Sequence, residues 1–144
     1  MREIFFLIAI LFFFVLFTGC KDKPESLCPC GKVEINKREY ISMCIIPNIV
    51  SENSVNKLRI ENHTKKAMVY GNPYMEYFNE NKWMPIEWDI NFTCIAYSLH
   101  AGESTEWEIN LYSLAEKYND AKKGKYRYIR SLNRYNLTAE FEVK

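Results

Sequence analysis

Five cysteines provide most of the distinctive side-chain chemistry in this chain of 144 residues. A thiol can be acylated, can form a disulfide bond or can ligate a metal ion. Cys28 and Cys30 flank a single proline, and this spacing is too tight for them to bridge each other comfortably. Cys44 and Cys94 lie in apolar, strand-like stretches, where a cysteine can be a disulfide partner or a buried free thiol. These four are the candidate disulfide residues, and three connectivities remain open.

Cys20 ends an N-terminal segment that is typical of an export signal. Arg2 precedes an unbroken apolar run of 14 residues, Ile4 to Phe17, whereas a membrane-spanning helix needs roughly 20. Thr18-Gly19-Cys20 then resembles a bacterial lipobox, with Phe17 in place of the usual Leu. We therefore predict a signal peptide at residues 1–19 and a lipid on Cys20 that anchors the protein in the cell envelope, at the bacterial outer membrane. The alternative is an uncleaved anchor helix.

Aromatic residues gather between residues 74 and 88. Tyr74, Tyr77, Trp83 and Trp88 lie there among Asn and Glu residues, and exposed rings with such neighbours suit protein partners or sugar faces. These four are the candidate binding residues. The alternative is that the rings fill the core or shield the edge of a sheet.

The sequence offers no arrangement that predicts catalysis. His63 and His100 lie in turn-like contexts without a second ligand at metal-binding spacing, and no Gly-rich phosphate loop or nucleophile elbow is present. We therefore expect no catalytic residues, no metal, no cofactor and no enzymatic activity. The net charge of +1 gives no electrostatic reason to expect a nucleic acid partner.

Short strand patterns must position these residues. Residues 20–32 are rich in polar residues, Pro and Gly and are predicted to be a tether, and residues 33–144 are predicted to be one domain. Apolar and polar residues alternate in several short segments, and one helical pattern spans residues 111–118. These elements predict an all-β antiparallel sandwich of seven or eight strands with one short helix, and a barrel is the alternative.

Turn signals divide the strands. Residues 47–56 are expected to form a loop, and Gly71-Asn72-Pro73 is expected to end a strand. Residues 79–82 are expected to connect a hairpin, because Asn tolerates the left-handed backbone that such turns require. Pro85 then predicts an edge strand, since it cannot donate a ladder hydrogen bond.

Several motifs together resemble a family of bacterial immunoglobulin-like domains found in small secreted lipoproteins and fused to envelope membrane proteins. The resemblance covers about residues 38–143. It rests on residues 58–64, Tyr70-Gly71, residues 74–78, Trp83, residues 97–102, Gly124-Lys125-Tyr126-Arg127 and residues 139–143.

This resemblance implies an immunoglobulin-like sandwich and no catalytic residues. It also places Tyr126 like the Tyr of a tyrosine corner, whose hydroxyl bonds to upstream backbone. Tyr128 stands where antibody domains have a Cys, so their standard disulfide is not expected. We therefore expect a lipid-anchored, non-catalytic envelope protein that binds another envelope protein, or alternatively a carbohydrate-binding surface module. The sequence does not predict the oligomeric state.

Overall fold

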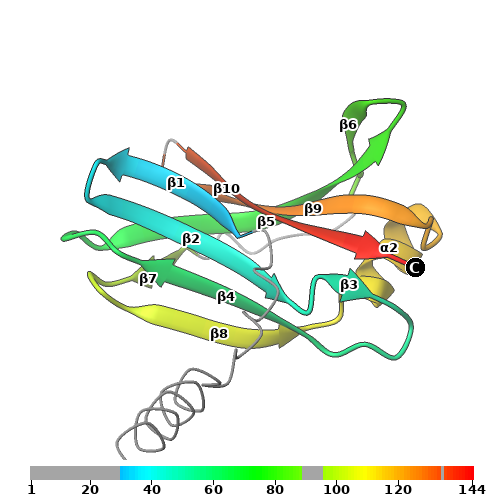
Figure 1. The fold of residues 1–144 in the computed structure, drawn as a ribbon, viewed down its shortest axis with the longest axis horizontal. Coiled ribbons are helices and arrows are strands. Elements are labelled where there is room, and N and C mark those ends of the chain that lie inside the picture. Colours follow the sequence, from blue (N-terminus) through cyan, green and yellow to red (C-terminus); the bar gives the residue numbers. More distant parts are fainter. Residues whose placement is uncertain (1–29, 89–95, 134) are drawn as a thin grey trace, which may run out of the picture.

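Two β-sheets face each other across an apolar core in the computed structural model, which describes residues 30–88, 96–133 and 135–144 (Figure 1). The first sheet contains, in spatial order, β1 (Gly31–Asn36), β2 (Glu39–Ile46), β4 (Asn56–Asn62) and β8 (Ser104–Ile109). The second contains β3 (Ile49–Val50), β10 (Tyr135–Val143), β9 (Gly124–Leu132), β5 (Met68–Asn79) and β6 (Lys82–Pro85), and β7 (Tyr97–Leu99) also pairs with β5. Helix α2 (Leu111–Asn119) connects β8 to β9.

The predicted immunoglobulin-like β-sandwich is confirmed, and the part of the chain that the structure describes has one short helix. Neighbouring strands in the described residues run antiparallel except β3, which pairs parallel with β10. The strands of the described part outnumber the expected seven or eight, because β3 falls in the predicted loop and β1 begins at Gly31, inside the predicted tether. The apolar pattern of residues 91–99 also predicts a strand. Residues 91–95 lie outside the described residues, and β7 covers Tyr97–Leu99.

Alternation along the strands fills the core. On β10, Leu137, Ala139, Phe141 and Val143 are at most 2% exposed, while Glu140 between them faces solvent. Side chains of a strand point alternately to its two faces, so this pattern directs one face of the strand into the sandwich. Each fully buried Leu or Phe contributes roughly 1.5–3 kcal/mol to stability.

Gly71-Asn72-Pro73 does not end a strand, contrary to the prediction. β5 runs through these residues, and its pairing with β9 changes register between Tyr70 and Pro73. Two residues of β5 therefore lie opposite one residue of β9, which is a β-bulge. A bulge tolerates the missing N–H of proline, and this is why the turn-like sequence fits inside the strand.

Gly31 lies where the two sheets meet at one side of the sandwich. A Cβ atom at this position would lie 1.4 Å from the carbonyl oxygen of Thr138 on β10. Any larger residue would push β1 away from β10. The glycine is therefore required by the close approach of two backbones, which is one of the physical uses of glycine.

Asn62 joins the two sheets at one end of the sandwich. Its side chain is buried, and its Nδ2 lies within 3.0 Å of the carbonyl oxygens of Lys66, Leu99 and His100. Its Oδ1 accepts a hydrogen bond from the backbone N–H of Thr64 (3.0 Å). These bonds satisfy the turning backbone at the end of β4.

Tyr126 forms the expected tyrosine corner at the opposite end. Its hydroxyl donates to the carbonyl oxygen of Lys122 (2.6 Å) and accepts from Nδ2 of Asn119 (2.9 Å). Its ring is fully buried and stacks on Phe141 (5.3 Å between centroids). Burial raises the pKa of this hydroxyl, and the hydrogen bond from Asn119 acts in the opposite direction.

We expect Tyr126→Phe to lower the free energy of unfolding by about 1–3 kcal/mol, because both part-buried hydrogen bonds of the hydroxyl would be lost. Urea unfolding measures this loss. Tyr77→Phe is the matched control, since Tyr77 lies directly opposite on β5 and its hydroxyl donates to the neighbouring carbonyl of Lys123 at an exposed site (3.2 Å). Water can replace that bond, so the control should lose less. Equal losses would contradict the importance of the corner.

Candidate functional site

The β5–β6 hairpin extends beyond the body of the sandwich (Figure 1). Asn79 pairs with Lys82, so the loop between the two strands consists of Glu80 and Asn81. Both loop residues have positive φ values, 47° and 64°, as a two-residue turn with the twist of a hairpin requires. Within the described residues β6 pairs only with β5, which confirms the edge strand predicted from Pro85.

The outer face of the hairpin combines aromatic and charged side chains. Phe78 and Trp83 lie opposite each other, with ring centroids 5.0 Å apart and planes inclined by 57°. Arg127 on β9 places its guanidinium carbon 4.5 Å from the centre of the Trp83 ring and forms an ion pair with Glu76. This cation–π contact contributes roughly 0.5–2 kcal/mol. Together with half-buried Tyr74, these side chains form a cross-strand cluster that we call the outer face.

The inner face of the hairpin packs against the core and helix α2. The ring of Tyr77 lies 4.9 Å from that of Tyr126, and Trp88 stacks on Tyr118 of the helix (5.7 Å, 15°). Met84 on β6 is 50% exposed. A groove of about 380 Å³ separates the hairpin from the helix. It is lined by Tyr77, Asn79, Met84, Pro85, Ile86, Glu87, Tyr118, Asn119 and Lys122.

The structure therefore divides the four candidate binding residues between two faces. Tyr77 and Trp88 pack against the core cluster on the inner side, and Tyr74 and Trp83 lie on the outer face. The sequence grouped them because they are close in the chain. Arg127 also belongs to the outer face, although β9 is far from the hairpin in the sequence. The one feature of the local sequence that could have indicated its outward position is that it alternates with the core residues of β9.

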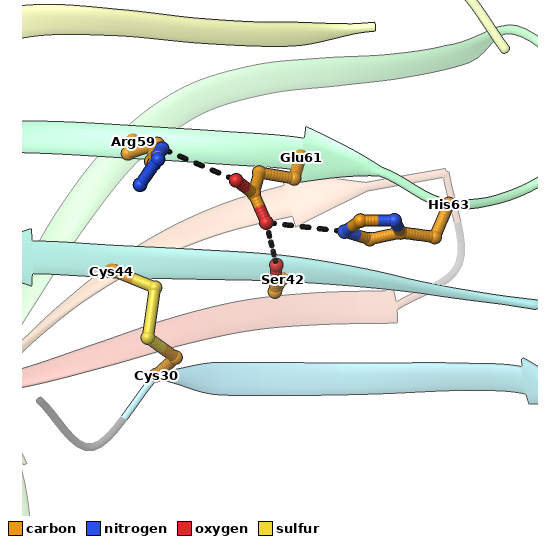
Figure 2. The surroundings of a disulfide bond; sticks show 6 residues. All are labelled: Cys30, Ser42, Cys44, Arg59, Glu61 and His63. Atoms are coloured by element: carbon orange, nitrogen blue, oxygen red, sulfur yellow. Dashed lines mark hydrogen bonds and ion pairs between the residues drawn. A yellow bond between two sulfur atoms is a disulfide. The ribbon is translucent and has the colours of Figure 1, made fainter. Parts of the chain in front are cut away.

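A polar cluster on the outside of the first sheet contains a serine, a histidine and a carboxylate (Figure 2). Oε2 of Glu61 lies 3.1 Å from Nε2 of His63 and 3.4 Å from Oγ of Ser42, and Oε1 lies 3.2 Å from Nε of Arg59. A serine relay requires the imidazole between the hydroxyl and the carboxylate. Here the carboxylate is in the middle, so the imidazole is not placed to accept the proton of Ser42. His63 instead stacks on Tyr40 (4.3 Å).

A disulfide bond joins two of the four candidate cysteines, Cys30 and Cys44 (Figure 2). The pairing of Gly31 with Met43 places these cysteines directly opposite each other on neighbouring strands. Their Cα atoms are 4.5 Å apart, as in the closer type of antiparallel pair. Cys20, Cys28 and Cys94 lie outside the described residues.

The described residues hold neither a group of metal-ligating side chains nor a helix that could span a membrane. In residues 30–88, 96–133 and 135–144, no three His, Cys, Asp or Glu side chains are grouped as metal ligands would be. Within the same ranges, no helix has the length and hydropathy that a membrane span requires.

Comparison with known proteins identifies the domain. A family model described as a bacterial Ig-like domain matches residues 37–142. No curated protein matches the chain. The DNA-bound alkylpurine DNA glycosylase AlkC from Pseudomonas fluorescens is similar in structure, with a TM-score of 0.40, 16% identity and coverage of 71% of this chain and 29% of that chain.

A β-glucosidase from Listeria innocua in complex with gluconolactone has a TM-score of 0.40 and 16% identity, covering 73% of this chain and 16% of that chain. The chain thus spans less than a third of either protein. Similarity at this level carries no argument about function.

Replacing both Cys30 and Cys44 by Ser should lower the free energy of unfolding by about 3 kcal/mol, as the chain-entropy model gives for a loop of about this length. The two cysteines are 14 residues apart. Chemical denaturation with and without a thiol reductant measures the effect.

The reductant provides the control for this experiment. It should destabilise the original protein to the level of the double variant and leave the variant unchanged. A variant that still loses stability on reduction would show that a different pairing holds the domain.

Proposed function

Because the chain belongs to the family of bacterial Ig-like domains, we propose that it is a lipid-anchored, non-catalytic module of the cell envelope that binds another envelope protein through the β5–β6 hairpin. The single observation that carries the proposal is this extended hairpin, with an aromatic outer face, an unpaired strand edge in the described structure and a groove beneath it.

The anchoring part of the proposal rests on the sequence. The apolar run ending in Thr18-Gly19-Cys20 is typical of a lipoprotein signal. β1 begins at Gly31, so the segment from Cys20 to the first strand can span at most about 40 Å. The domain would therefore work close to the membrane surface. Several acyl chains make such an anchor stable, because each buried CH₂ contributes ~0.8 kcal/mol.

The binding part rests on the composition and rigidity of the hairpin. Trp, Tyr and Arg are the residues most often found at the energetic centre of protein interfaces. Trp83 is held by Phe78 on one side and by Arg127 on another, so little side-chain freedom remains to be lost on binding. Exposed Met84 adds an apolar contact on the edge strand. An unpaired edge also offers backbone groups for strand addition.

Carbohydrate binding is the competing function, and the geometry favours it less. A sugar face packs best on a flat aromatic surface, whereas Phe78 and Trp83 are inclined by 57°. The inner rings, Tyr77 and Trp88, pack against the core cluster. The hairpin therefore suits a protein surface better than a sugar ring.

We expect Cys20→Ala to leave the unprocessed precursor and to abolish metabolic labelling with palmitate, because this thiol is the proposed acceptor of the lipid. Cys44→Ala is the matched control and should remain labelled, since Cys44 forms the disulfide. Labelling that persists in Cys20→Ala would overturn the anchoring proposal.

Crosslinking in intact cells followed by mass spectrometry tests the partner. We expect one reproducible envelope protein to be crosslinked. In the combined variant Trp83→Ala and Met84→Lys, the amount of this crosslinked partner should fall at least tenfold. These changes remove the central ring of the outer face and place a charge on the exposed edge.

Val55→Lys is the matched control, because Val55 is 64% exposed and lies in the loop between β3 and β4. Crosslinking should persist in this variant. A partner retained by the hairpin variant, or glycan binding in place of a protein partner, would overturn the proposal.

A further inference from the structure

Arg130 on β9 points into the sandwich, where charged side chains are rarely found. Only 8% of its surface is exposed. It occupies an inward position of β9, in line with the buried rings of Tyr126 and Tyr128. A guanidinium stays charged under all physiological conditions, so this position places a permanent cation between the sheets.

The fold satisfies this cation only in part. Nη1 donates to the carbonyl oxygen of Gly71 (2.9 Å), which the bulge in β5 releases from the ladder. Nε is buried and has no hydrogen-bond partner among the described residues. In that part of the chain no carboxylate lies within ion-pair distance of Arg130. A buried charge without a counterion is costly.

Aromatic rings surround the guanidinium. Its carbon lies 5.6 Å from the ring centre of Tyr70, 6.0 Å from Tyr97 and 5.7 Å from both Trp107 and Tyr128. Such cation–π contacts offset part of the desolvation cost of a cation. Of these residues, Tyr128 also offers Arg130 a hydrogen bond through its hydroxyl. The buried Nε–H is left without an acceptor among the described residues.

Arg130 also lines an open cavity between the edges of the two sheets. The cavity measures about 300 Å³, and its other lining residues are Tyr70, Tyr97, Thr105 and Trp107. The rings of Tyr70 and Tyr97 are nearly parallel, 5.4 Å apart at 16°. Tyr97 is 46% exposed at the mouth, and the hydroxyl of Thr105 can donate a hydrogen bond.

We propose that this cavity is a binding site for a small organic carboxylate with a flat, apolar body. The carboxylate accepts hydrogen bonds from the guanidinium surface of Arg130, a charge-assisted contact of the strong class. The body lies against the aromatic walls of the cavity. The volume is at the lower end of the range for ligand pockets, so the ligand is small. The site lies toward the opposite end of β5 from the hairpin and does not depend on the function proposed above.

The test uses benzoate as the probe and the full chain in detergent micelles. The chain contains three tryptophans, so their indole N–H signals in a ¹H–¹⁵N spectrum are separate reporters, and Trp107→Phe assigns the one at the cavity. We expect benzoate to shift the signals of Trp107 and of the Arg130 Nε–H in a saturable manner. Benzamide, which has the same shape without the charge, should bind at least tenfold more weakly.

Arg130→Gln should weaken benzoate binding at least tenfold, and Arg59→Gln should leave it unchanged, because Arg59 lies on the outer surface with Glu61. If Arg130→Gln fails to fold, the benzoate affinity of Tyr97→Ala tests the proposal instead, because this exposed ring can be removed without opening the core. That variant should bind severalfold more weakly. No saturable shift, equal binding of benzamide, or unchanged affinity in folded Arg130→Gln or Tyr97→Ala would overturn the proposal.

Discussion

The amide of Asn62 imposes the constraint on which one whole end of the sandwich depends. Its side-chain N–H groups bind the carbonyl of Lys66 in the turn after β4 and the carbonyls of Leu99 and His100 at the end of β7, and its Oδ1 accepts from the N–H of Thr64. Its backbone N–H and carbonyl also bond to Glu103 and Gly102 in the turn before β8. One buried residue thus fixes the relative position of the edge strands of the two sheets. A buried amide with all its groups satisfied is specific in geometry, because any shift would leave a polar group unpaired.

Different buried side chains fix the neighbouring elements at the two ends of the sandwich. Asn62 sets the spacing between β7 and β8, and therefore the width of the cavity between Tyr97 and Trp107. At the other end, Tyr126 ties β9 to the turn after α2, and the helix in turn supports the inner face of the hairpin. Both candidate sites therefore lie on strands and a helix that these hydrogen bonds hold in place. Rigid support of this kind lowers the entropy cost of binding.

Local patterns predicted much of the fold, and contacts between distant segments account for the rest. Alternation of apolar and polar residues predicted strands, and the helical pattern at residues 111–118 predicted α2, because each of these signals lies within one element. Gly71-Asn72-Pro73 was interpreted as a strand end because a bulge depends on the partner strand, which local sequence does not reveal. Arg130 was missed for a similar reason. From the sequence alone, a single Arg in a β-strand is expected to face solvent. Only the assembled sheets show that Arg130 points inward.

The disulfide has a mechanical consequence for a protein that is held at its N-terminal side. In the anchored form proposed above, any pull between the membrane and a bound partner enters the domain at Cys30. β1 is an edge strand that pairs only with β2 in the described structure, so a load at its first residue would open the ladder one pair at a time. The covalent link to Cys44 passes that load directly to β2, which has neighbours on both sides. The load therefore does not act on the pairing of β1 with β2. It must instead break the pairing of β2 inside the sheet before the domain can open.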